Sequence, residues 1–342
     1  MKKIKKIILL FFVFSSLKLN AETCDEKIIS TFSVAAYHSE TKEVGVAVQS
    51  KFFGVGVVVP WVKAGVGAIA TQSFANTTFG PRGLEMMEEG MSPEETLNIL
   101  IETDDNPEMR QVGLVKTDGT GFSYTGGECM AWAGGTVETT KDGITFAAQG
   151  NILASEKVVE AMAQAMHKNT HLDFAARLVA ALIAGQEQGG DSRGMQSAAL
   201  LVEKEGAGYG GYTDVKYDLR VDDSKNPFKE LERLLDLGRP IALTFEAYNL
   251  TYEGKFEEAL KIFLNLVQLY PEDASHPYNA ACSYALQGNP KESIKMLRKA
   301  INIDESIIGW MNSDPDLKSL REMEDFKNLS LMKKNDWFFG NK

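Results

Sequence analysis

The expected fold is decided by two neighbouring segments, Thr31-Phe32-Ser33-Val34-Ala35-Ala36-Tyr37 and Val44-Gly45-Val46-Ala47-Val48. Both are short and apolar, and the polar residues 38–42 between them suit a turn, so they predict paired strands. Further strands are predicted at residues 54–59, 67–71, 112–115, 144–147 and 197–202. Helical spacing is found at residues 84–100, 158–166 and 172–186. Because strands and helices come in blocks rather than in regular alternation, residues 31–235 are expected to form a layered α+β domain.

Beyond about residue 240 the pattern changes to helices, and similar residues recur 34 positions apart. The matched pairs are Ala247 with Ala281, Gly254 with Gly288, Ala259 with Ser293, Leu260 with Ile294, and Phe263 with Leu297. This spacing resembles tetratricopeptide repeats, so residues 240–330 are expected to form about two all-α repeats with a capping helix at 315–329. Two repeats leave an apolar face open, and they should dock on the first domain or on another chain. Residues 206–227 are expected to form a surface loop.

The first 21 residues have the pattern of a secretory signal peptide. Lysines at positions 2, 3, 5 and 6 precede an apolar run at residues 7–14, and Ala21 offers a cleavage point. The run is too short to span a bilayer, which argues against a stable membrane anchor. A lipid on Cys24 is the alternative, although residues 21–23 match a lipidation signal poorly. The pattern predicts an exported protein, periplasmic or secreted, in which residues 22–30 are an N-terminal extension or propeptide.

Composition argues against several classes of protein. The chain of 342 residues has a net charge of −11, whereas nucleic-acid binding needs a basic surface. A hydrophobic fraction of 44% is too high for a disordered chain. Three cysteines (24, 129 and 282) are too few for a multi-cysteine metal site and do not require a disulfide. The residues between His167 and His171 break any zinc-protease motif, so we expect no metal and no cofactor.

Polar side chains gather at the predicted strand ends and on glycine-bounded loops of the first domain. They are Gln49, Ser50, Gln72, Ser73, Arg110, Gln111, Gln149, Asn151, Asp191, Arg193, Gln196 and Asp222. Groups in such places can converge on one cleft, where amides, hydroxyls and a carboxylate–arginine pair suit the recognition of a neutral polar substrate. The structural alternative is that each of them caps a helix, satisfies loop backbone or forms a pair. Considered together, they favour a site for a small-molecule or peptide substrate.

A series of motifs also occurs in one order along the first domain. The series is Thr31–Ala35, Gly45–Ser50, Val59–Trp61, Gly65–Gln72, Arg110-Gln111, Gly150-Asn151, Gly189–Asp191, Arg193-Gly194, Gln196–Ala199 and Leu219–Asp223. Together these motifs resemble the bacterial and archaeal family called domain of unknown function 1028, over about residues 31–235. That family in turn resembles the N-terminal nucleophile (Ntn) hydrolases, which implies a four-layer αββα sandwich.

The Ntn resemblance implies a catalytic role for Thr31. In such enzymes a threonine, serine or cysteine opens the first strand and attacks an amide carbonyl, and its own α-amine is the general base. An α-amine has a pKa of about 7.7–8.0, so it accepts a proton near neutral pH. By the same analogy Lys63 would depress the pKa of Thr31 and Asp191 would orient the amine. The Gly150-Asn151 amides would then form the oxyanion hole.

This chemistry requires a second cut, because cleavage after Ala21 leaves nine residues before Thr31. Removal of residues 22–30 at the Ser30–Thr31 bond would free the amine. The expected function is then an exported Ntn-type amidohydrolase with an unknown small or peptide substrate. Without the cut, the alternative is a non-catalytic periplasmic binding or adaptor protein that uses the sandwich cleft or the helical repeats. The open face of the repeats also accommodates a protein partner or a second copy of the chain.

Overall fold

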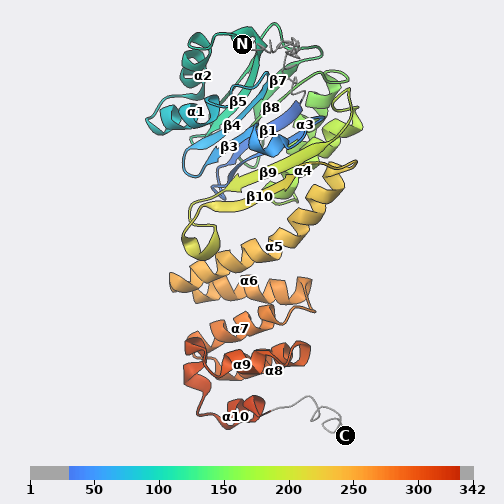
Figure 1. Cartoon of the computed structure of the whole chain (residues 1–342). Helices are drawn as coiled ribbons and strands as arrows, with labels where there is room; N and C mark the ends of the chain where they lie inside the picture. The colour runs from blue at the N-terminus through green and yellow to red at the C-terminus, as the bar shows by residue number, and fades with distance from the viewer. Residues whose placement is uncertain (1–30, 332–342) are drawn as a thin grey trace, which may run out of the picture.

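The computed structural model describes residues 31–331, which form an α+β part followed by an all-helical part (Figure 1). The predicted signal peptide and the extension at residues 22–30 lie outside the described residues. The α+β part contains two antiparallel sheets, and the helical part extends from one end of it as a stack. The expected order of an α+β region followed by an α region is confirmed.

The larger sheet has six strands in the order β10-β9-β2-β1-β8-β7. Its strands are β1 (Thr31–His38), β2 (Val44–Ser50), β7 (Gly134–Thr139), β8 (Ile144–Asn151), β9 (Ser197–Glu203) and β10 (Val215–Val221). The predicted pairing of the first two segments is confirmed, with Val34 opposite Ala47. The expected surface loop at 206–227 is wrong where β10 forms. Tyr217 and Val221 of β10 are buried, whereas the charged residues between them hide the alternating pattern.

The smaller sheet has four strands in the order β3-β4-β5-β6. Its strands are β3 (Pro60–Lys63), β4 (Gly67–Ser73), β5 (Arg110–Lys116) and β6 (Gly121–Thr125). The predicted strand at 54–59 is wrong, because Val55–Val57 form a short 3-10 helix, η1, after Gly54 adopts a φ of 66°. Strands β3, β6 and β7 were not predicted, since each lies at a sheet edge, is only partly buried and lacks a long apolar run.

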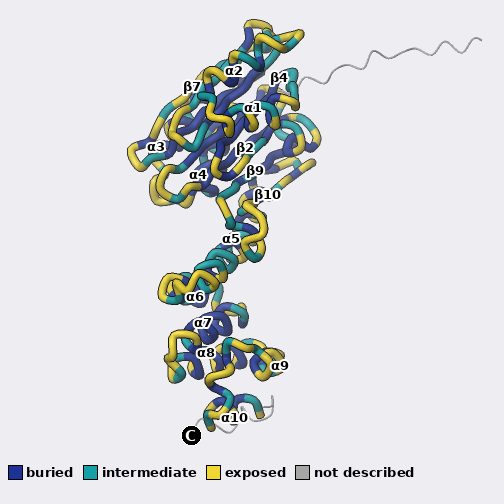
Figure 2. The backbone as a smooth tube through the Cα atoms, turned by 90° about the vertical axis from the view of Figure 1, so that its left-hand side faces the viewer, coloured by how far each residue is buried: buried dark blue, intermediate teal, exposed yellow. Residues whose placement is uncertain are grey.

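The two sheets pack face to face, and helices cover their outer faces (Figures 1 and 2). Helices α1 (Phe79–Glu88) and α2 (Pro93–Glu102) lie on the smaller sheet, and α3 (Lys157–Lys168) and α4 (Phe174–Glu187) lie on the larger one. Successive residues of a strand point to opposite faces, so each central strand contributes to two cores. In β1, for example, Val34 packs under the helices and Ala35 packs between the sheets.

The segment with helical spacing at residues 84–100 is divided between α1 and α2. Gly90, with a φ of 107°, follows the end of α1. The second helix begins after Ser92, whose hydroxyl accepts a hydrogen bond from the Glu95 N–H at 3.2 Å. The Glu95 carboxylate accepts one from the Ser92 N–H at 2.9 Å, and Pro93 occupies the first turn. This reciprocal capping and the proline explain where the second helix starts.

The all-helical part begins at the sheet and continues to the end of the described chain. Its elements are α5 (Pro227–Tyr252), α6 (Phe256–Leu269), α7 (Ser275–Leu286), α8 (Pro290–Ile303), α9 (Ile307–Met311), η4 (Pro315–Leu320) and α10 (Glu324–Ser330). Helix α5 is continuous across residues 235–240, where a domain boundary was expected. The expected capping helix is two short elements, η4 and α10. Among residues 31–331, no helix is both long and apolar enough to cross a membrane.

The 34-residue spacing corresponds to equivalent positions in successive helix pairs. Ala247 on α5 and Ala281 on α7 are fully buried, and so are Ala259 on α6 and Ser293 on α8. These small residues allow close approach of neighbouring helices, and the Ser293 hydroxyl donates to the Ala281 carbonyl at 2.7 Å. The larger residues of the repeat are also buried in both copies.

Candidate functional site

The candidate site begins with a row of four polar residues across the larger sheet. In this row Asn151 of β8 pairs with Thr31 of β1, Thr31 pairs with Ser50 of β2, and Ser50 pairs with Ser197 of β9. All four residues are fully buried. They share a strand face with Ala35, Val48 and Ala199, which pack between the sheets. The row therefore lies inside the sandwich, at the end where β1 begins.

A second polar row, in the smaller sheet, lies opposite the first. Gln72 of β4 pairs with Gln111 of β5, and Gln111 pairs with Thr125 of β6. The Gln72 Nε2 donates to the Gln111 Oε1 at 2.8 Å. The Gln111 Nε2 donates to the Thr125 hydroxyl at 3.0 Å and to the Gly150 carbonyl at 2.8 Å. Gln111 thus joins the smaller sheet to the larger one.

Ser33 and Gln149 continue this network one step deeper. They pair with each other across β1 and β8. The Ser33 hydroxyl donates to the Gln72 Oε1 at 2.6 Å, and the Gln149 Nε2 donates to the Ser33 hydroxyl at 2.7 Å. Gln72 is therefore held by Ser33 on one side and by Gln111 on the other. These partners fix the orientation of the Gln72 amide, whereas the Gln149 Oε1 is buried without a hydrogen-bond partner among the described residues.

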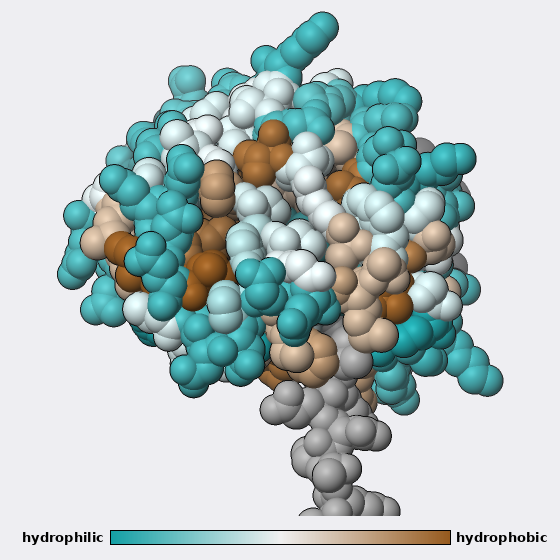
Figure 3. Space-filling view, turned by 90° about the horizontal axis from the view of Figure 1, so that it is seen from above, coloured by the Kyte–Doolittle hydropathy of each residue, from teal (hydrophilic) through white to brown (hydrophobic). Residues whose placement is uncertain are grey.

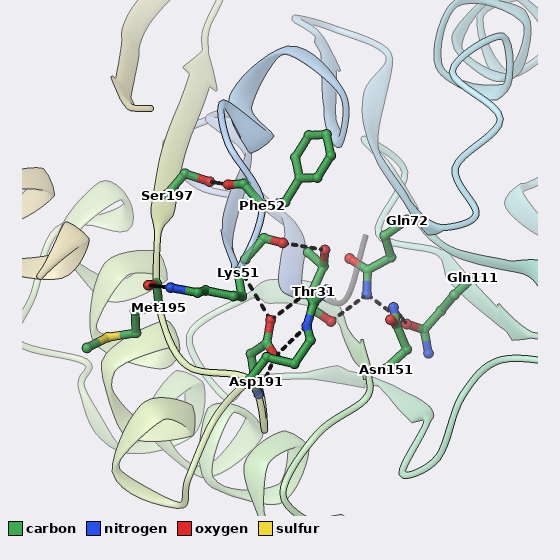
Figure 4. A network of polar contacts seen from close by, with 11 residues as sticks. Thr31, Lys51, Phe52, Gln72, Gln111, Asn151, Asp191, Met195 and Ser197 are labelled. Atoms are coloured by element: carbon green, nitrogen blue, oxygen red, sulfur yellow. Dashed lines mark hydrogen bonds and ion pairs between the residues drawn. The ribbon is translucent and has the colours of Figure 1, made fainter. Parts of the chain in front are cut away.

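Thr31 lies at the centre of these contacts (Figure 4). Its hydroxyl donates to the Ser50 hydroxyl at 3.3 Å, and its carbonyl accepts from the Gln72 Nε2 at 3.3 Å. On the other side, the Asn151 Nδ2 donates to the Gln111 Oε1 at 2.9 Å. Thr31 thus contacts a hydroxyl through its side chain and an amide through its carbonyl.

Asp191 lies beside the end of β2 and bonds to the residue that follows it. Its side chain is buried and forms an ion pair with Arg193, with the Arg193 Nη2 at 3.0 Å from the Asp191 Oδ2. The same oxygen accepts from the Lys51 backbone N–H at 2.9 Å. The loop of Asp191 also bridges to Leu153, just after β8. Asp191 consequently links the ends of β2 and β8 that flank Thr31, the first through its carboxylate and the second through its backbone.

Two residues beside the network have an unfavourable backbone conformation. Ser73, at the end of β4, has a φ of 66°, and Ile152, directly after β8, has a φ of 52°. A β-branched residue in the left-handed region is strained, and such strain concentrates at functional sites. The Ile152 N–H donates to the Met130 carbonyl at 2.9 Å, and its carbonyl accepts from the Ser192 N–H at 3.0 Å. The strained residue therefore links the two loops on this end of the sandwich.

Three predicted site residues point away from the space between the sheets. Gln49 shares the face of Ala47, which packs toward the helices, and its side-chain amide is fully buried there. Ser73 and Arg110 follow the outer face of the smaller sheet, and the Arg110 guanidinium pairs with Asp104 at 3.0 Å. Burial would raise the pKa of Asp104, but hydrogen bonds from Arg110, Asn76 and the Asn106 N–H, with the Arg110 charge, hold it below its ordinary value. This pair is structural.

Three more predicted residues lie outside the network. Lys63 pairs with Gly67 of β4. Gly67 lies five residues from Gln72 on the same strand, so Lys63 is about 17 Å from the level of Gln72 along the strand. Its ammonium contacts Glu88 at an exposed position, so Lys63 has no place beside Thr31 and we drop its catalytic role. The Gln196 Nε2 donates to Asp223 at 3.1 Å, and Asp222 is exposed. The other predicted residues are in the network or anchor its strand ends.

Two network members, Ser33 and Thr125, were not among the predicted site residues, whereas Ser197 follows the predicted Gln196 in the same polar segment. The signal for Ser33 was available, because it lies two residues from Thr31 and must share its strand face. Thr125 ends a strand that was not predicted. Ser197 is occupied structurally, since its hydroxyl donates to the Phe52 carbonyl and accepts from the Val55 N–H.

Neutral hydroxyls and amides make the network a poor metal site and a suitable environment for hydroxyl chemistry. Cys129 lies nearby, with its Sγ 3.3 Å from the Arg110 carbonyl, but burial raises the pKa of this thiol and disfavours the thiolate. Elsewhere, within residues 31–331, ligand atoms of Cys282, Asp314 and Asp316 lie within 4.8 Å of one another. There burial raises the pKa of the Cys282 thiol, and the Tyr278 hydroxyl donates to Asp314. That trio is arranged as a hydrogen-bonded cluster.

Comparison with known proteins identifies relatives of this chain. The model of the family of unknown function DUF1028 matches residues 31–231. The crystal structure of protein SPO2555 from Silicibacter pomeroyi, described as family-model DUF1028, is similar with a TM-score of 0.53 and 29% identity. That match covers 60% of this chain and 88% of SPO2555. The chain is also similar to a chloroplastic protein of Arabidopsis thaliana, with 27% identity over 142 residues. These 142 residues are 41% of this chain. The match spans 40%, or two fifths, of that curated relative.

Proposed function

The chain belongs to the DUF1028 family of unknown function, and we propose that it is an amide hydrolase of the N-terminal nucleophile type with Thr31 as nucleophile. The observation that carries this proposal is the position of Thr31. It is the first residue of a central strand, and its hydroxyl lies 3.3 Å from Ser50 among buried neutral groups that join both sheets. The packing of two sheets with helices outside is the coarser feature that an Ntn-type sandwich requires.

The reaction follows from the groups at this strand end. The α-amine of an N-terminal Thr31 takes the hydroxyl proton while the oxygen attacks the amide carbonyl carbon. The C–N bond then breaks as the amine returns that proton to the leaving nitrogen, which leaves an acyl ester on Thr31. Water activated by the same amine hydrolyses the ester and restores the hydroxyl. An α-amine is suited to both steps because its pKa of about 7.7–8.0 lies close to neutral pH.

The surrounding network supplies positioning. Gln72 fixes the Thr31 carbonyl, and Ser50 fixes the direction of its hydroxyl. Asn151 lies directly across β1 from Thr31 and presents an amide at the same level, so it is the candidate to stabilise the oxyanion. Asp191 and Arg193 hold the strand ends that carry these groups. Because the rows contain no charge, the proposed substrate presents a neutral amide.

The proposal also requires cleavage of the N-terminal segment and export of the protein. Residues 22–30 must be removed so that Thr31 carries a free amine, and residues 1–21 have the pattern of an export signal. The mature enzyme would therefore act in the periplasm or outside the cell. An unprocessed chain would retain the hydroxyl at Thr31 but would lack the base, because a backbone amide nitrogen does not accept a proton near neutral pH.

Labelling with a hydroxyl-reactive β-lactone probe tests this proposal. Wild-type protein and Thr31→Ser, which keeps a hydroxyl, should both form a stable adduct on residue 31. Thr31→Val preserves the side-chain shape without the hydroxyl and should not react. Mapping the adduct by peptide mass spectrometry identifies the residue. An adduct on Ser50 or Cys129 instead, or equal labelling of Thr31→Val, would contradict the assignment.

A second proposal concerns the helical part, which we infer to be a tetratricopeptide-like adaptor. Helix α5 exposes an apolar stripe, in which Leu237 and Ile241 are 57% and 55% exposed and Tyr252 is 81% exposed. Exposed apolar surface of this kind marks interaction sites. If the occupant is a second copy of the chain, sedimentation should show a concentration-dependent oligomer. The double variant Leu237→Ser with Ile241→Ser should sediment as a monomer, and an unchanged oligomer would exclude this stripe.

A further inference from the structure

A cavity lies where the α+β part meets the helical part. It has a volume of about 500 Å³ and is bordered by the connection from β9 to β10 and by the end of α5 with the start of α6. Figure 1 shows this connection reaching the lower end of α5. Small-molecule sites have volumes of about 300–1,000 Å³ and are common at such junctions. Lys204, at its edge, follows β9 at the end opposite Ser197, so the cavity is remote from Thr31.

The walls of this cavity are held in place without a ligand. The Asn249 Nδ2 on α5 donates to the Gly206 carbonyl at 2.6 Å, which fixes the connection against the helix. The Gly206 N–H donates to the Asp214 carboxylate at 2.9 Å. Gly211 has a φ of 72°, which suits glycine, and a side chain there would approach Asn249. The cavity is thus preformed, which lowers the entropic cost of binding.

Three lysines (204, 216 and 255) and three glutamates (205, 246 and 253) line the cavity, and two of the lysines already pair with a carboxylate. Lys216 is committed to Glu43 at 2.7 Å, and both side chains are largely buried. Lys255 is paired with Glu253 at 2.7 Å. The Lys204 Nζ, just after β9, lies 3.9 Å from the Glu246 Oε1 on α5, which is too long for a hydrogen bond. Their side chains are 32% and 36% exposed, so both can accept a closer partner.

We propose that this cavity binds a small zwitterion, a short peptide with free termini, whose carboxylate contacts Lys204 and whose ammonium contacts Glu246. A simple anion would meet the Glu246 carboxylate, and a simple cation would meet the Lys204 ammonium, so a ligand with both charges is favoured. Both side chains are about one-third exposed, so they can move apart from 3.9 Å to receive the two more widely spaced termini. Ala242, Leu250 and the exposed ring of Tyr252 provide apolar contact for the rest of the ligand. The two charged contacts come from different parts of the chain, so the ligand would bridge the junction.

Calorimetric titration of the full chain with trialanine tests this proposal. Trialanine should bind, and its N-acetylated, C-amidated form should bind at least about tenfold more weakly, because each blocked terminus loses a charge-assisted hydrogen bond. Lys204→Met and Glu246→Gln should each weaken trialanine binding by about the same factor. Lys255→Met, in the same wall but outside the proposed contacts, should leave it within about twofold.

Melting curves of the variants show whether the fold is retained, which is expected because both changed side chains are about one-third exposed. No binding of trialanine to the wild-type chain would overturn the proposal. Equal binding of the blocked peptide, or unchanged binding by Lys204→Met and Glu246→Gln, would also overturn it. The outcome is independent of the Thr31 chemistry, because the assay measures binding only.

Discussion

The hydroxyl of Thr31 lies 3.3 Å from the hydroxyl of Ser50, at paired positions on neighbouring strands. This places the first described residue of the chain against a group that can fix the direction of its hydroxyl. Polar side chains of the opposite sheet complete the environment, and Gln72 contacts the same residue through its carbonyl. Seen from the end of the molecule, the surface is mostly hydrophilic with separate apolar patches (Figure 3). Thr31, Ser50 and Gln72 are fully buried beneath this surface.

Replacement of Gln72 by leucine should strongly destabilise the protein. The Gln72 amide contacts Ser33, Gln111 and the Thr31 carbonyl, and all of these groups are buried. Leucine fills most of the space, but the Ser33 hydroxyl loses its acceptor and the Thr31 carbonyl loses the Gln72 donor, while Gln111 keeps its bond from Asn151. Each buried group left unsatisfied costs about 1–3 kcal/mol before relaxation. We expect the free energy of unfolding to fall by about 3 kcal/mol in urea titrations.

Gln196→Leu is the matched control for this variant. The Gln196 side chain donates to Asp223 at an exposed position, and its backbone bonds do not depend on the side chain, so the same substitution should change the free energy of unfolding by less than about 0.5 kcal/mol. Equal effects of the two variants would show that the buried network contributes nothing specific to stability.

Ile152→Asn should stabilise the fold. The φ of 52° at Ile152 is unfavourable for a β-branched residue, whereas asparagine adopts this conformation readily. Relief of strain should raise the free energy of unfolding by about 0.5–1 kcal/mol. The comparison is Ile183→Asn on α4, a partly buried isoleucine in a helix, which should destabilise. If both variants lose stability equally in urea, Ile152 stores no strain.

Asp142 should contribute stability that depends on pH. Its carboxylate pairs with Arg177, a side chain only 1% exposed, and hydrogen bonds from this guanidinium hold the pKa of Asp142 well below its ordinary value. In acid the unfolded chain binds the proton first. The contribution is therefore complete above the ordinary pKa, about 4, and is lost as the pH falls toward the lowered value.

Asp142→Asn leaves the buried Arg177 charge without its counter-ion, so the free energy of unfolding at neutral pH should fall by about 3 kcal/mol. The variant should also show a shallower loss of stability between about pH 4 and pH 2. Asp218→Asn removes the exposed partner of Arg220 and should cost less than about 0.5 kcal/mol. Parallel acid-unfolding profiles of wild type and Asp142→Asn would refute this prediction.

Ala281→Leu should disrupt the helical part. Ala281 is fully buried on α7, and its carbonyl accepts the hydrogen bond of Ser293 on α8, so no space remains for a larger side chain. Overpacking of this kind costs about 1–3 kcal/mol. Thermal melts followed by circular dichroism should show earlier loss of helix. Lys299→Leu, at an exposed position of α8, should melt like the wild type; an early transition there would point to a nonspecific effect.

Strand periodicity explains how much of the site could be predicted from the sequence. The sequence places Thr31, Gln72 and Asn151 at strand ends, and the structure brings them to one end of the sandwich. Adjacent residues on a strand point in opposite directions. A consistent use of this rule would have separated Ser50 from Gln49 and added Ser33 to the site.

The remaining differences have physical causes that lie outside local sequence. Strands β6, β7 and β10 are edge or partly exposed strands, so their apolar patterns are weak. The position of Lys63 depends on the register of β3 with β4, which local pattern does not define. The 34-residue spacing, in contrast, depends on helix contacts within a short stretch, and its small residues were located correctly.

Determination of the N-terminus of the mature protein tests the central claim most directly. The protein should be expressed with its complete N-terminal sequence in an export-competent bacterium, purified, and analysed by intact mass and N-terminal sequencing. We expect a chain that begins with Thr31 and carries a free α-amine. Thr31→Ala should leave residues 22–30 attached if the cut is autocatalytic. A wild-type chain that begins at Glu22, with Thr31 still in amide linkage, would contradict the proposed mechanism.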